Sequence, residues 1–131
     1  GGMLDGPADC TRDNVMSLPK DGCLLRVFVG ESSRAGGTAV YESIVQKARE
    51  LKLAGATVLR GVMGFGANSR LHAAHFLSLS DDLPVVIEIV DTRERVESLL
   101  PFIESVVHDG MVTLEQVEIH FYRANTQEQS Q

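Results

Sequence analysis

The chain has 131 residues, of which 44% are hydrophobic and 23% charged, and its formal net charge is −6. This length suffices for one domain with its own core. The acidic balance argues against a general nucleic-acid-binding protein, which needs a basic face. No apolar run approaches the roughly 20 residues needed to span a bilayer. We therefore expect a cytoplasmic protein in which Cys10 and Cys23 are reduced thiols.

The two ends of the chain differ in composition from the middle. Residues 1–22 carry Gly, Pro, Asp and Asn with few apolar residues, which predicts a disordered leader. Residues 124–131 are polar and predict a disordered tail. A single domain is expected between them, at residues 23–123.

The first half of this domain predicts a strand followed by a helix. Residues 23–29 alternate, with Leu25, Val27 and Val29 on one face. After a glycine-containing loop, Thr38 is the expected N-cap of a helix at residues 39–53. That helix carries one apolar stripe at helical spacing, formed by Tyr41, Ile44, Val45, Ala48 and Leu51.

Residues 56–66 are the most informative stretch. They predict a second strand that ends in Gly64, Phe65 and Gly66, and a long connection at residues 66–81 follows. Glycines allow another group to approach the backbone closely, and Arg70 adds positive charge, so this stretch is suited to holding an anion. The alternative is that the glycines only end a strand before a long loop.

The second half repeats the pattern. Residues 83–90 predict a third strand with both faces largely covered. Asp91 begins a capping-box spacing for a second helix, which we expect to reach about His108 and to be kinked or loosened at Pro101. Asp109 and Gly110 should end it, and a fourth strand is expected within residues 111–122.

The order β-α-β-β-α-β predicts an α+β, ferredoxin-like fold: an antiparallel four-stranded sheet with two helices on one face. The other face is then bare, and we expect it to be buried against another subunit. Its charges should pair, Arg26 and Arg60 with Glu88 and Glu118; the alternative is that they reach water at a wet face. The expected bare-face residues are Leu24, Arg26, Phe28, Val58, Arg60, Val62, Val86, Glu88, Val90, Glu118, His120 and Tyr122.

Several segments together resemble a family of uncharacterised PII-like domains, domain-of-unknown-function family 190, within the nitrogen-regulatory PII superfamily. The matching segments are RVFVGE (26–31), AGATVLRG (54–61), MGFG (63–66), LPVVIE (83–88) and VTLE (112–115). The resemblance implies a homotrimer with the bare sheet faces inward and nucleotide sites in the clefts between subunits. It also implies that the residue 66–81 connection contacts partners.

By the same resemblance, the nucleotide-binding residues are Gly64, Phe65, Gly66, Arg70, Asp109 and Gly110, and the ligand is an adenine nucleotide. Met111 stands where PII proteins proper have a phosphate-binding lysine. A monophosphate, a dinucleotide or another small anion is therefore an equal candidate, because a triphosphate needs close cations.

The function this favours is a signalling regulator, not an enzyme, that binds a small effector between subunits and signals through the 66–81 loop. Its partner is expected to be a membrane transporter or another regulated protein. One alternative is a metal-binding trimeric regulator in which His72 and His75, one helical turn apart, supply two ligands, although no third ligand is recognisable nearby. Another is a protein-interaction module with a vestigial ligand site.

Overall fold

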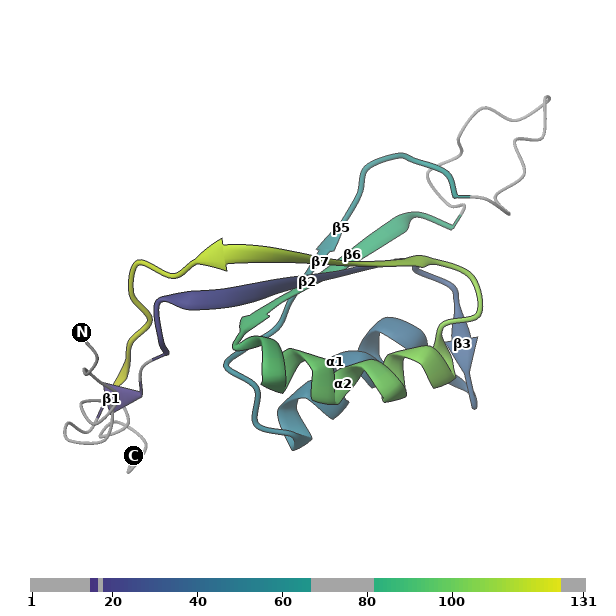
Figure 1. The fold of residues 1–131 in the computed structure, drawn as a ribbon. Coiled ribbons are helices and arrows are strands. Elements are labelled where there is room, and N and C mark those ends of the chain that lie inside the picture. Colours follow the sequence, from purple (N-terminus) through teal and green to yellow (C-terminus); the bar gives the residue numbers. More distant parts are fainter. Residues whose placement is uncertain (1–14, 17, 67–81, 126–131) are drawn as a thin grey trace.

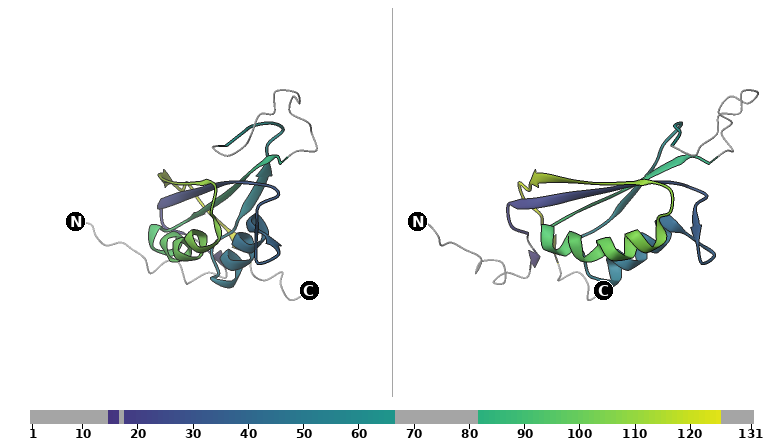
Figure 2. Two further views of the ribbon diagram at one scale, coloured as in Figure 1. Left: turned by 90° about the vertical axis from the view of Figure 1, so that its right-hand side faces the viewer. Right: turned by 45° about the vertical axis from the view of Figure 1, so that its right-hand side comes forward.

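A computed structural model describes residues 15–16, 18–66 and 82–125, and within them the chain forms a two-layer fold (Figure 1). One layer is a four-stranded sheet of order β5-β6-β2-β7, antiparallel throughout. Its strands are β2 (Asp21–Gly30), β5 (Thr57–Arg60), β6 (Pro84–Asp91) and β7 (Met111–Glu118). The other layer contains α1 (Val40–Glu50) and α2 (Arg93–Val106), which lie side by side against one face of the sheet (Figure 2). The predicted ferredoxin-like β-α-β-β-α-β fold is confirmed.

Two short ladders add to this frame. In one of them β1 (Val15–Met16) pairs with β8 (Ala124–Asn125), so ordered pairing extends beyond both ends of the predicted domain. The other, β3 (Arg34–Ala35) with β4 (Thr38–Ala39), is a hairpin whose two loop residues, Gly36 and Gly37, have φ of 61° and 86°. Positive φ at both loop positions is the geometry of a two-residue hairpin turn, and glycine adopts it without a steric cost.

Both predicted helix starts are wrong by one residue. Thr38 belongs to the β3–β4 hairpin, so Ala39 is the N-cap of α1, without a side-chain cap. The carbonyl of Ser33 accepts the Val40 N–H instead, at 2.9 Å. In α2 the cap is Thr92, whose Oγ1 accepts from the N–H of Arg95 at 3.2 Å, and α2 continues past Pro101 to Val106.

Asp91 is the buried carboxylate beside this cap. Its side chain accepts hydrogen bonds from the backbone N–H of Thr92 (2.7 Å), from the backbone N–H of Ala54 (2.8 Å) and from Arg95 Nε (3.2 Å). It is 0% exposed. Asp91 therefore joins the turn after α1 to the start of α2, and the polar groups around it are satisfied, as a buried charge requires.

The predicted second strand is too long. The structure ends β5 at Arg60, and the N–H of Gly61 makes the last bond to β6, at 2.7 Å from the carbonyl oxygen of Pro84. Pro84 has no N–H to donate in return, so the ladder stops there. Residues 61–66 therefore leave the sheet.

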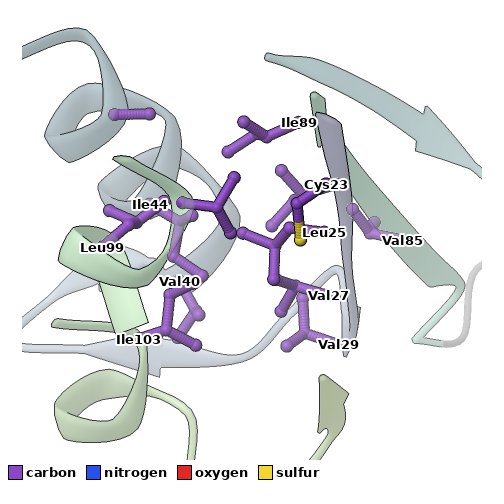
Figure 3. Packing of buried hydrophobic residues seen from close by; sticks show 13 residues of the cluster. Cys23, Leu25, Val27, Val29, Val40, Ile44, Val85, Ile89, Leu99 and Ile103 are labelled. Atoms are coloured by element: carbon purple, nitrogen blue, oxygen red, sulfur yellow. The ribbon is translucent and has the colours of Figure 1, made fainter. Parts of the chain in front are cut away.

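The core lies between the sheet and the helices (Figure 3). Alternate residues of β2 and β6 point toward the apolar stripes of α1 and α2, as the sequence pattern predicts. Cys23 is part of this core as a free thiol. The fully buried side chains include Leu25, Val27, Ile44, Ile87, Ile89, Leu99 and Ile103.

The register corrects part of the predicted bare face. Directly opposed residues of an antiparallel pair share a face, and Arg60 lies opposite Val85, which is buried against the helices. Arg60 is therefore on the helix side, as is Val58 opposite Ile87, and the bare face instead carries Thr57 and Leu59.

The same reasoning moves Glu118, which is opposite Asp21, to the helix side, where its carboxylate lies 3.1 Å from Lys20 Nζ. Because β7 ends at Glu118, the placement of His120 and Tyr122 on the sheet is also wrong. Tyr122 donates its hydroxyl to the carbonyl of Ala54 at 3.0 Å, and the His120 ring contacts Phe121.

Arg26, Glu88 and Phe28 do lie on the bare face. Arg26 donates to Glu88 at 2.9 Å, as predicted. It also donates to Glu115 at 3.2 Å, so Glu115 is the second acidic partner that was predicted to be Glu118. The hydrogen bond with Glu88 is the main cause that raises the pKa of Arg26 above its ordinary value; burial acts in the opposite direction. The bare face thus carries a paired charge cluster.

Neither helix in the described part of the chain combines the length and the apolar character needed to cross a lipid bilayer.

Candidate functional site

A cavity of about 410 Å³ lies at the end of the sheet where β2 stops and β6 begins. The segment after β5 and the turn between α2 and β7 complete its wall. Its lining residues are Phe28, Val29, Gly30, Ser33, Gly64, Phe65, Gly66, Asp82, Pro84, Asp109, Gly110 and Met111.

Five of the six residues predicted to bind a nucleotide meet in this cavity. Gly64, Phe65 and Gly66 lie in the segment after β5, and Asp109 and Gly110 lie in a turn more than forty positions further along the chain. The sixth, Arg70, lies outside the described residues. The structure thus brings the five described residues of the predicted set together in space.

The glycines of the cavity are sites of close approach. A Cβ on Gly110 would lie 2.4 Å from the carbonyl oxygen of Phe28 and 3.1 Å from Val29 Cγ1. A Cβ on Gly64 would lie 3.0 Å from Cγ of Pro84. Without side chains at these positions, the α2–β7 turn and the segment after β5 can lie directly against the ends of β2 and β6.

Asp82 is a cavity residue that the sequence reasoning missed. Its Oδ1 accepts the N–H of Ser32 at 2.8 Å, and the N–H of Glu31 donates to the carbonyl of Leu83 at 2.8 Å. These bonds fasten the turn after β2 to the residues before β6. The local sequence around Asp82 is typical of a turn, but it does not predict a bond to Ser32, which lies fifty positions earlier in the chain.

Apart from Ser33, the side chains of the described cavity lining are apolar or acidic. Phe65, Met111 and Phe28 are exposed by 73%, 60% and 37%, so the rim is an open apolar surface. The charged groups are the carboxylates of Asp82 and Asp109; among the described lining residues there is no Lys, Arg or His. Arg60, at the end of β5, already pairs with Glu31 at 2.6 Å.

His72 and His75, the alternative metal ligands, lie outside the described residues, so the metal-binding alternative stays a prediction. Within residues 15–16, 18–66 and 82–125, no three His, Cys, Asp or Glu side chains gather as a metal site.

A second groove, of about 720 Å³, runs between α1 and the edge strand β5, with Tyr41, Val45 and Phe102 in its wall. It was not predicted, because it depends on β5 turning Val58 toward α1.

The sequence matches a known protein family and has relatives in other organisms. Residues 22–119 match the model of DUF190, described as "Uncharacterized ACR, COG1993". The chain belongs to the DUF190 family. A UPF0166 protein of Aquifex aeolicus is 36% identical over 96 residues, which cover 73% of this chain and 90% of that protein. A UPF0166 protein of Methanocaldococcus jannaschii is 29% identical over 106 residues, covering 80% and 95%.

Solved structures agree with the fold seen in this DUF190 member. CPII of Thiomonas intermedia K12, a structure with ADP and bicarbonate, has a TM-score of 0.52 at 19% identity and covers 76% of this chain and 88% of its own. A putative PII-like signaling protein of Thermus thermophilus has a TM-score of 0.54 at 14% identity, covering 79% and 91%. These likenesses show the PII-like form of the ferredoxin-like fold.

Proposed function

We propose that this DUF190 protein is a PII-like regulator that binds an adenine nucleotide, or a similar small anionic metabolite, in the cavity at the end of β2 and β6. The observation that carries the proposal is the meeting of Gly64, Phe65 and Gly66 with Asp109 and Gly110 around one preformed space. A cavity of about 410 Å³ with mostly apolar walls and a few polar groups is of the size and character that small ligands use.

The structural relatives support this choice of ligand. CPII of Thiomonas intermedia K12 has been solved with ADP and bicarbonate and, in another structure, with ADP, AMP and bicarbonate. Phe65 offers an exposed ring on which a purine base can stack, and backbone N–H groups of glycine-rich segments are suitable donors to a phosphate.

The exposed rim suggests that the cavity is completed by a second protomer. Phe65 and Met111 expose most of their surface in one protomer, and burial of such side chains is favourable. In the proposed homotrimer the bare sheet faces turn inward. Arg26 enters that interface already paired with Glu88 and Glu115, which reduces the cost of removing its charge from water.

Signalling would pass through the residue 66–81 connection, which joins Gly66 of the cavity to the segment before Asp82. Ligand binding between these two ends is proposed to change the fit of the connection to a regulated protein, such as a membrane transporter. Arg70, within that connection, is proposed to stand at the mouth of the site. In this role the protein acts by binding and catalyses no reaction.

Calorimetric titration with AMP, ADP, ATP and cyclic AMP tests the proposal. We expect at least one of them to bind the wild-type protein, and Phe65→Ala to weaken binding about fivefold or more through loss of a stacking surface. Phe121→Ala is the matched control, because Phe121 is also an exposed ring but lies outside the cavity lining. No heat with any nucleotide would leave the protein-interaction module with a vestigial site as the better description.

A further inference from the structure

The charges around the cavity suggest which nucleotides it accepts. Asp82 and Asp109 both line it, and no basic side chain of the described lining balances them. Most sites that hold di- or triphosphates surround the added negative charge with cations or a metal ion. The described lining presents carboxylates instead, so a further phosphate group near Asp82 and Asp109 would meet repulsion, whereas Arg70, proposed at the mouth, lies outside the described residues.

Asp82 is held in place at the wall. The N–H of Ser32 fixes one of its carboxylate oxygens, and the other would lie 2.3 Å from a Cβ on Gly30, so the carboxylate rests directly against the Gly30 backbone. A rotation of Asp82 away from the ligand would give up the bond with Ser32. Its charge is therefore a fixed feature of the site.

The carboxylate of Asp109, unlike that of Asp82, has no bonded neighbour in the described part of the chain. It makes no hydrogen bond or ion pair with any part of the chain that the structure describes. Arg34 and His108 line a separate, smaller cavity of about 60 Å³ that shares Asp109, but they do not line the larger one. Arg60 is occupied by its ion pair with Glu31.

We propose that Asp82 and Asp109 select ligands of low negative charge, so that the cavity prefers a nucleoside monophosphate or a cyclic mononucleotide to a nucleoside di- or triphosphate. This inference rests on the proposed function and concerns the class of ligand in the same site. A negative charge on the ligand about 10 Å from a carboxylate, at an effective dielectric constant of about 20, lowers the affinity for that ligand roughly tenfold before screening by salt.

The test compares affinities for AMP, cyclic AMP, ADP and ATP in the wild-type protein, Asp109→Asn and Glu94→Gln. Asparagine keeps the size of the side chain and removes its charge. Glu94→Gln removes the same charge at the exposed first turn of α2, and the 14-residue helix places it about 20 Å from Asp109. Thermal unfolding of each variant checks that the fold is retained.

We expect the wild-type protein to bind AMP or cyclic AMP more tightly than ADP and ATP. Asp109→Asn should reduce the ratio of the ADP to the AMP dissociation constant about threefold or more, and Glu94→Gln should leave it unchanged. Added salt should improve ADP binding more than AMP binding. Tighter binding of ATP than of AMP, or an unchanged ratio in Asp109→Asn, would overturn the inference while the proposed function stands. Absence of binding by every nucleotide would instead contradict the proposed function itself.

Discussion

Gly110 is the residue at which fold and site can be perturbed together. A Cβ added to it would lie 2.4 Å from the carbonyl oxygen of Phe28, and real Cβ atoms essentially never come closer than 3.0 Å to such an atom. Alanine therefore requires the turn and the end of β2 to separate by about 0.6 Å, the difference between these distances. Val29 Cγ1 and Val107 Cγ1, at 3.1 and 3.2 Å, block the neighbouring directions.

We expect Gly110→Ala to destabilise the protein by about 1–3 kcal/mol, the usual cost of inserting a methyl group where there is no room. It should also weaken nucleotide binding, because Asp109, Gly110 and Met111 move as one segment of the cavity wall. Urea denaturation measures the first effect through a lower midpoint at constant slope. Calorimetric titration measures the second in the fraction that remains folded.

Gly55→Ala is the control for this experiment. A Cβ on Gly55 would have nothing within 4 Å, so the substitution should be neutral or slightly stabilising by less than about 1 kcal/mol. It removes the same glycine flexibility from the unfolded chain. If Gly110→Ala and Gly55→Ala gave the same stability and the same affinity, the close approach at Gly110 would have no consequence and the reasoning would be refuted.

Two further substitutions test the fold and the proposed assembly. Asp91→Ala leaves the N–H groups of Ala54 and Thr92 without their acceptor, and it should lower the free energy of unfolding in urea by about 3–5 kcal/mol. Thr92→Ala removes only the helix cap and should lower it by about 1 kcal/mol. A loss below about 1 kcal/mol for Asp91→Ala would contradict the role of Asp91. Leu59→Asp adds a charge to the bare face, where Leu59 is 49% exposed, and should dissociate the proposed trimer, whereas Gln46→Asp on exposed α1 should not. Light scattering after gel filtration distinguishes the two outcomes, and a wild-type protein that is a lone protomer would contradict the trimer.

The layers of the fold could be predicted because each element carries a strong pattern. The alternation in β2 and the apolar stripes of the helices assign most core positions, although the predicted stripe of α1 omits the buried Val40. Residues 57–60 are different, since Val58 and Leu59 are both apolar and either can face the helices. The pairing of Val58 with Ile87 decides between them, and a shift of one residue exchanges the faces.

The error in β7 has a related cause. The predicted bare face took Glu118, His120 and Tyr122 from this strand, but β7 ends at Glu118, so two of these three residues are outside the sheet. Val112 and Leu114, opposite Val27 and Leu25, give the correct phase. Strand ends depend on which partner residues remain to bond, and this information is absent from a local pattern.

The predicted site came from the resemblance to a family rather than from local chemistry. Gly64 to Gly66 form a weak signal alone, and Asp109-Gly110 reads as an ordinary helix end. Asp82 could not be assigned to the site, because its approach to the cavity depends on the turn after β2 that it holds through Ser32. The acidic character of the cavity is therefore a result of tertiary structure.

Pro84 connects the end of the sheet to the formation of the cavity. Because it lacks an N–H, it ends the β5–β6 ladder at Gly61 and releases the following segment from the sheet. Its ring then fills the space left by two glycines, since a Cβ on Gly61 or Gly64 would lie 2.8 or 3.0 Å from Pro84 Cγ. The released segment is thus held against β6 by shape and not by a ladder, and Phe65 comes to the cavity rim. A longer ladder would have continued the alternation of a strand through these residues, and Gly64, Phe65 and Gly66 would then have lain along the sheet edge instead of around a ligand-sized space.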